Sequence, residues 1–247
     1  MNGFLPRIVR VLAWTGLGVA AACAVAELMA GLGYRFGWWH FRTGIQMVRW
    51  AATVDLGAVL VALIAVAGAV FLGPRSALTA AIAGLTIAVL TAAPPLYHWR
   101  LADQVPRIHD ISTDTANPPR YVAVLPLRNG AENGVEYSAE VAAQQKMAYP
   151  EIRPAMLDAS PAQAYERAER AARAIGWEIV SASPQELRIE ATDTTLLFGF
   201  KDDIVVRVSP NGAGSRVDVR SLSRVGRSDI GVNARRVLAY LKKLGSG

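Results

Sequence analysis

The sequence predicts a membrane-anchored α+β protein, in which three transmembrane helices precede a small soluble domain with two helices covering an antiparallel sheet. Two uncharged runs, Leu56–Pro74 and Ser76–Trp99, each approach the roughly 20 residues that cross a hydrocarbon core. After Arg100 the composition becomes that of a water-soluble domain. We therefore expect a membrane region over residues 1–100, a linker over 101–119 and a soluble domain over 120–247.

Charge is distributed unevenly along the chain. Hydrophobic residues make up 52% of the sequence, and the net charge is +6. Up to Gln104 there are seven Arg residues against three acids, whereas the remainder carries nineteen Lys and Arg against seventeen acids. Arginines that flank apolar helices are usual in membrane proteins. The basic composition is therefore explained without nucleic acid, and we expect no nucleic-acid partner.

The first span is predicted over about Ile8–Leu32 and the second from near Trp50, and the third is expected to end at Pro94-Pro95, where backbone donors are missing. Glu27 and Asp55 fall inside the first two spans, where a carboxylate is costly without a partner. They could form a proton or ion relay. We favour pairing with the interfacial arginines, which are Arg35, Arg42 and Arg49.

The connection Tyr34–Trp50 interleaves aromatic residues with arginines and is expected to lie along the membrane surface as an interfacial anchor, with a lipid-headgroup site as the alternative. Cys23 is the only cysteine, which excludes an intramolecular disulfide. Its surroundings are loosely similar to a lipoprotein signal with a lipid-accepting cysteine, but the apolar sequence continues through Met29, as in a retained helix.

The soluble domain is predicted to start with a strand, Tyr121–Leu125, followed over Asn129–Met147 by a loop with some helix. The clearest helix start is Ser160-Pro161-Ala162-Gln163, which has the sequence of a capping box with Pro at the first helical position. Gly176 is placed to end this helix.

Alternation of apolar and polar residues then predicts strands over Trp177–Val180 and Leu187–Thr192, continued by Thr195–Phe200. Turns are expected at Lys201–Asp203 and Asn211–Gly214, with strands Ile204–Val208 and Val217–Val219 between and after them. A last helix, capped by Ser228 or Asp229, completes the domain.

Four segments together resemble the DUF1499 family, a domain of unknown function. They are Ile108–Asp114, Tyr149-Pro150, Phe198–Asp203 and Ser223–Ala234, and the resemblance covers roughly Pro106 to Leu244. It implies bacterial envelope and plastid relatives that carry membrane spans or a lipoprotein signal, with no established activity to transfer.

Two arguments about the side of the membrane that holds the soluble domain give opposite answers. Three spans place the termini on opposite sides, and a close count of flanking arginines puts the C-terminal domain in the cytoplasm. The lipoprotein-like relatives implied by the resemblance favour the outside instead. We follow the second argument and expect a multi-pass inner-membrane protein with a periplasmic C-terminal domain.

The candidate binding residues gather around the predicted last helix. Cations beside free backbone donors at a helix N-terminus form an anion pocket, and glycines at 226 and 231 permit close approach. The structural alternative is that Ser228 caps the helix, Gly226 makes a turn and Arg224 pairs with Asp202 or Asp203. The candidates are Arg220, Arg224, Arg227, Ser228, Asp229, Asn233, Lys201, Asp202, Asp203, His109 and Asp114.

An acid–base pair or a hard-metal site could be built from His109 with Asp110 and Asp114, or from Asp202 with Asp203. Neither group has diagnostic spacing, and no nucleophile elbow, P-loop, dinucleotide fingerprint or zincin helix is present. We therefore assign no catalytic residue, no cofactor and no metal.

The sequence favours a membrane-anchored accessory module whose soluble domain binds an anionic ligand, a lipid headgroup or a protein partner near the bilayer. A hydrolase or transferase that uses Asp202 or Asp203 with His109 is the rival class. A structural subunit of a membrane complex is the third.

Overall fold

The computed structural model describes residues 4–72 and 75–246, which form two compact units. The first unit comprises the chain up to Arg100 together with Leu196–Gly199, and the second comprises Leu101–Thr195 and the chain from Phe200. The end of the first predicted uncharged run, Gly73-Pro74, lies outside the described residues.

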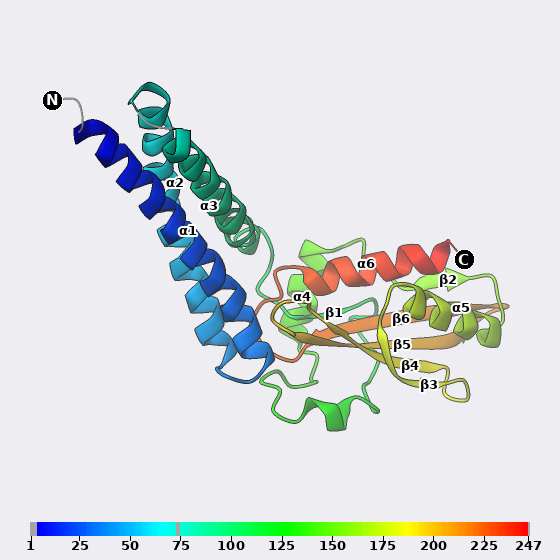
Figure 1. Ribbon diagram of the computed structural model, residues 1–247. Coiled ribbons are helices and arrows are strands. Elements are labelled where there is room, and N and C mark those ends of the chain that lie inside the picture. The colour runs from blue at the N-terminus through cyan, green and yellow to red at the C-terminus, as the bar shows by residue number, and fades with distance from the viewer. Residues whose placement is uncertain (1–3, 73–74, 247) are drawn as a thin grey trace. The chain divides into compact units, whose positions relative to one another are not determined.

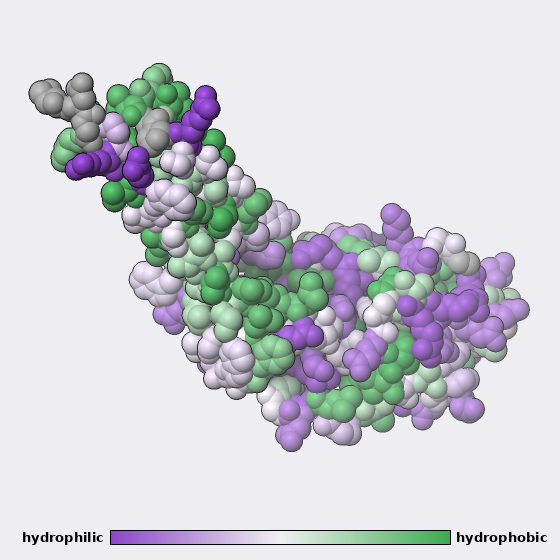
Figure 2. Space-filling model, viewed as in Figure 1, coloured by the Kyte–Doolittle hydropathy of each residue, from purple (hydrophilic) through white to green (hydrophobic). Residues whose placement is uncertain are grey.

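The first unit contains three helices that are long and apolar enough to cross a membrane: α1 (Phe4–Arg35), α2 (Phe41–Leu72) and α3 (Arg75–Ala102). Their buried faces consist mainly of Ala and Gly, whereas large aliphatic side chains point outward, so that apolar residues cover the surface of this unit (Figures 1 and 2). Small residues let membrane helices approach closely while lipid solvates the larger ones. The three predicted apolar helices are confirmed.

Two predicted helix boundaries are wrong. α2 begins at Phe41 instead of near Trp50, so most of the segment expected along the membrane surface is helical. α3 passes through Pro94 and Pro95 and ends only at Ala102. Each proline removes one intrahelical donor, a loss that membrane helices tolerate because neighbouring groups satisfy the freed carbonyls.

The predicted pairing of the membrane carboxylates with arginines is also wrong. Asp55 is fully buried, and its Oδ2 lies 2.6 Å from the Thr91 hydroxyl oxygen of α3. Within the described residues, one oxygen each of Glu27 and Asp55 is buried without a hydrogen-bond partner.

The second unit is an antiparallel sheet with helices. Its strand order is β1-β6-β5-β4-β3, and β2 pairs with β6 beyond the end of β1. The strands are β1 (Asp110–Ser112), β2 (Ala155–Leu157), β3 (Glu178–Ser183), β4 (Arg188–Thr194), β5 (Lys201–Asn211) and β6 (Gly214–Ser223). The helices are η1 (Leu125–Arg128, 3-10), α4 (Ala139–Ala148), α5 (Pro161–Ala174) and α6 (Val232–Gly245). The predicted α+β fold class is confirmed, although β1 lies within the segment expected to be a linker.

The helix starts follow local side-chain chemistry. Ser160 and Gln163 form the predicted capping box of α5, and Gly176 follows the helix with a positive φ of 88°. α6 starts one turn later than expected, with Gly231 at the N-cap. The carboxylate of Asp229 accepts the backbone N–H groups of Gly231 (2.8 Å) and Asn233 (2.7 Å), so Asp229 satisfies this helix end in place of a cap residue.

Three of the predicted local structures are wrong. Tyr121–Leu125 is not a strand, because the N–H groups of Val122 and Val124 bind a carboxylate instead of a neighbouring strand. Thr195–Phe200 is the turn between β4 and β5, where Gly199 has a positive φ, and Lys201–Asp203 belongs to β5. The predicted turn at Asn211–Gly214 is confirmed.

The two faces of the sheet are covered differently. α5 and α6 lie on one face and enclose the hydrophobic core, while the residues after β1 cross the other face without regular strands (Figure 1). Alternate residues of β5 show this division: Ile204, Val206 and Val208 lie in the core. Tyr240 of α6 is fully buried there, stacks on Trp177 with 4.8 Å between ring centroids, and donates a hydrogen bond to the Ala168 carbonyl.

Replacement of Tyr240 by Ala is expected to lower the free energy of unfolding of the domain by about 3–5 kcal/mol, because a large buried ring is lost. Tyr240→Phe keeps the ring and loses only one hydrogen bond, at about 1 kcal/mol. Urea titration of the full chain in detergent, followed by ¹⁹F NMR of 5-fluorotryptophan at Trp177, measures both. Similar losses for the two variants would contradict the packing role of the ring.

Candidate functional site

The segment Thr113–Ser138, which we call the cover segment, crosses the sheet face opposite α5 and α6. Beyond its single 3-10 turn it has no regular structure, so its backbone N–H and C=O groups need partners from elsewhere. Buried charged side chains of the sheet supply many of them. This arrangement explains why several sequence-predicted site residues lie beneath the segment.

Glu190 of β4 is fully buried and binds the cover segment through its carboxylate. Its oxygens accept the backbone N–H groups of Val122 and Val124 at 3.0 Å, and Arg188 pairs with it at 3.0 Å. A carboxylate that accepts backbone N–H groups replaces the strand partner that these residues lack. Glu190 therefore determines where this part of the cover segment lies.

Asp203 of β5 is the centre of a second buried cluster. Its carboxylate accepts hydrogen bonds from Arg128 (2.5 Å), from Arg224 (2.7 and 2.9 Å) and from the Thr192 hydroxyl (2.8 Å). Arg224 also donates to the Leu127 carbonyl at 2.6 Å. One carboxylate thus fixes the C-terminal end of η1, and the predicted pairing of Arg224 with Asp202 or Asp203 is confirmed for Asp203.

Tyr121 of the cover segment also binds a residue of this cluster. Its hydroxyl donates to the Asp203 backbone carbonyl at 3.0 Å. Burial raises the pKa of the Tyr121 phenol well above its ordinary value, so the group stays protonated and keeps its donor.

Arg220 of β6 binds the remaining parts of the cover segment. It makes a bidentate ion pair with Asp110 (2.9 and 2.6 Å) and donates to the carbonyls of Pro119 and Val135. Tyr121 and Tyr137 enclose its guanidinium, which lies 5.0 and 5.3 Å from their ring centroids. Burial alone would lower the pKa of Arg220, but the hydrogen bonds and charge of Asp110 raise it overall, so Arg220 remains ionised.

The other face of the sheet carries a cluster centred on α6. Arg236 pairs with Asp202 at 2.6 Å and with Asp193 at 2.8 Å, and it donates to the side-chain oxygen of Asn233. The Asn233 amide donates in turn to the His109 carbonyl and to Ser223. Asp202 and Asp203 are adjacent in β5, so their side chains point to opposite faces and enter separate clusters.

The remaining predicted site residues lie apart from one another. The ring of His109 contacts the Arg227 carbonyl at 3.3 Å, and Ser228 accepts the Ile230 N–H. Lys201 is exposed at the start of β5. Asp114 binds Arg207 and Arg216, which also share Asp218.

The positions of His109, Asp202 and Asp203 are relevant to the hypothesis that the protein is a hydrolase or transferase. Asp203 meets Arg224, but the described contact of the His109 ring is with the Arg227 carbonyl, and only the backbone carbonyl of His109 is linked to Asp202, through Asn233 and Arg236. Among the described residues there is no group of three or more His, Cys, Asp or Glu that could hold a metal ion. The described contacts of the predicted residues therefore connect elements of the fold to each other.

Sequence reasoning missed Glu190, Arg128 and Arg236. Glu190 alternates with apolar residues in β4, and this pattern predicted a solvent-facing side chain. The signal that could have identified it was the long segment without periodicity before α4, since such a segment must either leave the domain or cover a sheet face with polar partners.

The outer side of η1 is apolar. Val122, Leu125 and Leu127 are each about half exposed, with Pro126 between the two leucines also exposed. We call these four residues the η1 platform. Neighbouring exposed apolar side chains on a short segment indicate an interaction surface more strongly than scattered ones do.

Comparison with known proteins gives one match. The family model described as a protein of unknown function (DUF1499) matches residues 110–244. No curated protein and no solved structure matches the chain. The matched region includes the Glu190, Asp203, Arg220 and Arg236 clusters and the η1 platform.

Replacement of Asp203 by Ala is expected to lower the free energy of unfolding by about 3–5 kcal/mol, because two guanidinium groups lose their carboxylate in a buried site. Glu166→Ala breaks an exposed pair with Arg170 and is the matched control, with a change below about 1 kcal/mol. The same urea titration measures both. Hydrogen exchange of the cover segment is expected to accelerate in Asp203→Ala alone; equal protection in both variants would contradict its anchoring by Asp203.

Proposed function

Because the chain belongs to the DUF1499 family of proteins of unknown function, we propose its function from its own geometry: it is a membrane-anchored binding module whose soluble domain docks on the bilayer surface through the η1 platform. The observation that carries this proposal is a group of exposed apolar side chains on a backbone that buried charges hold in place.

The anchoring of η1 supports a recognition role. Glu190, Asp203 and Arg224 fix the backbone on the inner side of the segment, so the outward direction of Leu125 and Leu127 is determined. A surface held in one conformation loses little conformational entropy on binding. Exposed leucines on a rigid segment are therefore suited to an apolar target.

The membrane tether favours the bilayer as that target. Seven residues, Asp103 to His109, separate α3 from β1, and an extended chain of this length reaches about 25 Å. The domain therefore stays near the membrane, where a weak apolar contact is occupied because of the high effective concentration. An anion at Arg220 or Arg224 would have to displace Asp110 or Asp203, which makes the predicted anion pocket the weaker alternative.

The proposed orientation places the spans in the inner membrane of a bacterial envelope, with the soluble domain in the periplasm. The support is the envelope setting implied by the family resemblance, set against a close count of flanking arginines.

A C-terminal fusion tests this orientation. Alkaline phosphatase attached after Gly247 is expected to be active, and green fluorescent protein at the same position is expected to be dark. The reverse pair of results would place the domain in the cytoplasm and overturn the periplasmic assignment.

Lipid contact by the η1 platform is tested with an environment-sensitive fluorophore on a single introduced cysteine, in a Cys23→Ser background, with the full chain in nanodiscs. A label at Leu127→Cys is expected to emit at shorter wavelength and to be quenched by nitroxide lipids. A label at Ala213→Cys, on the exposed β5–β6 turn, is the matched control and is expected to respond as in water.

Equal responses at the two positions would show that the platform does not meet lipid. A label at Leu127→Cys that is shielded from water without quenching by nitroxide lipids would indicate a protein contact and would also contradict docking on the bilayer. Replacement of Leu125 by Ser, on the surface, is expected to reduce the quenching without unfolding the domain.

A further inference from the structure

The membrane helices contain two carboxylates that no described arginine or lysine neutralises. Asp55 of α2 is fully buried, and its Oδ1 has no hydrogen-bond partner. Oε1 of Glu27, on α1, is also buried without a partner. An ionised carboxylate at such a position is costly, so the site requires a positive charge or a neutral carboxyl group.

The hydrogen bonds of Thr91 distinguish these two solutions. Its Oγ1 lies 2.6 Å from Asp55 Oδ2 and 2.9 Å from the carbonyl of Ile87, but a hydroxyl has only one hydrogen to donate. If that hydrogen binds Ile87, the contact with Asp55 is a hydrogen bond only when Oδ2 carries a proton and donates it to Thr91.

Other threonines of the membrane helices show which acceptor this hydroxyl takes. Thr53, Thr79 and Thr86 each donate to the carbonyl four residues earlier, at 2.8, 3.1 and 2.9 Å. Thr91 has the same contact with Ile87 at 2.9 Å. The shared pattern favours donation of its hydrogen to the helix backbone, and the short contact with Asp55 then requires a proton on the carboxyl group.

The groups around Asp55 match a protonated carboxyl better than a bound metal. Cys23 and Glu27 of α1 lie close enough to Asp55 to interact with it electrostatically, while α3 contributes Thr91. Hard cations take six or more oxygen ligands, and the described residues hold no cluster of three metal-binding side chains. A single proton satisfies the oxygens that are present.

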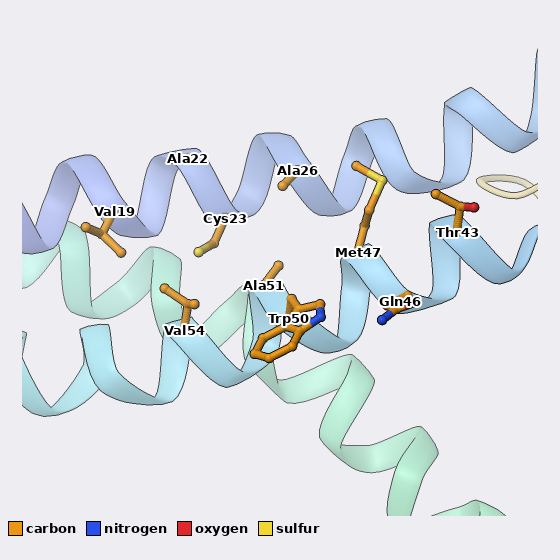
Figure 3. A pocket seen from close by; sticks show the side chains of 10 residues that line it. All are labelled: Val19, Ala22, Cys23, Ala26, Thr43, Gln46, Met47, Trp50, Ala51 and Val54. Atoms are coloured by element: carbon orange, nitrogen blue, oxygen red, sulfur yellow. The ribbon is translucent and has the colours of Figure 1, made fainter. Parts of the chain in front are cut away.

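A groove lies beside Cys23 of this cluster. It has a volume of about 550 Å³ and lies between α1 and α2, where Cys23 forms part of its wall (Figure 3). Thr43 and Gln46 add polar side chains to the same groove. Cys23 thus contacts both the groove and Asp55.

We propose that Asp55, together with Glu27, Cys23 and Thr91, forms a proton-binding site inside the membrane-helix bundle. Binding converts the Asp55 carboxylate into a carboxylic acid: an O–H bond forms at Oδ2, and the hydronium ion that supplies the proton becomes water. Glu27 is the second acceptor of the site. This inference is independent of lipid contact by the soluble domain.

Infrared difference spectroscopy of the full chain in lipid nanodiscs tests the proposal. At neutral pH, the wild type is expected to show a carboxylic-acid C=O band that shifts in D₂O and disappears on strong alkalinisation. Asp55→Asn is expected to lose the Asp55 component of the band, whereas Glu27→Gln keeps this component. Thr91→Val is expected to keep the band at a higher frequency, because the acid loses its acceptor.

Circular dichroism of each variant verifies that the helices remain folded. The absence of a carboxylic-acid band in the wild type, or a band that is unchanged in Asp55→Asn, would overturn the proposal. Loss of the band on addition of sodium chloride at constant pH would assign the site to a metal cation and would overturn it as well.

Discussion

The soluble unit depends on the way in which the backbone of the cover segment finds hydrogen-bond partners. A sheet face must be covered, and a segment without strands or long helices cannot satisfy its own N–H and C=O groups. Here Glu190 accepts two backbone N–H groups, and Arg220 and Arg224 donate to carbonyls of the segment. Removal of any one of these side chains leaves backbone groups of the cover segment without their partner, and removal of Arg220 also takes the described ion-pair partner from Asp110.

This dependence changes how the motifs of the matched family region are interpreted in this chain. Asp203 with Arg224, and Asp202 with Arg236, each connect a strand to another element. A guanidinium that already holds a carboxylate and a carbonyl has few donors left for a ligand. The motif residues therefore position the surface of the domain, and the residues available for recognition lie on the outside of the segment that they hold.

What could be predicted from the sequence divides between local and distant interactions. The capping box at Ser160 and the turn at Asn211–Gly214 depend on residues a few positions apart, and both were predicted correctly. Tyr121–Leu125 failed because the partner of its backbone is Glu190, almost seventy residues away. Lys201–Asp203 looked like a turn because its charges suggested solvent, and only the distant Arg128, Arg224 and Arg236 make those charges compatible with a buried strand.

The same division between local and distant interactions applies to the candidate site. The pairing of Arg224 with Asp202 or Asp203 followed from the need of nearby opposite charges to meet, whereas the pairing of Arg220 with Asp110 joins two ends of the domain and left no local signal. The pairing expected for Asp55 failed for a related reason. The arginines of the first unit lie toward the helix ends, and the count of charges in a segment does not show how far each side chain can reach.

The two units therefore bury carboxylates by different means, and the difference has a functional consequence. In the soluble unit, Asp110, Asp202 and Asp203 are each held by at least one guanidinium, so a change in the charge of any of them would break an ion pair. Asp55 has a hydroxyl and a thiol as neighbours, and neither carries a compensating charge. A change in the charge of Asp55 therefore breaks none of the described ion pairs. Proton binding at the proposed site in the membrane helices would for that reason leave the charge clusters of the soluble domain intact.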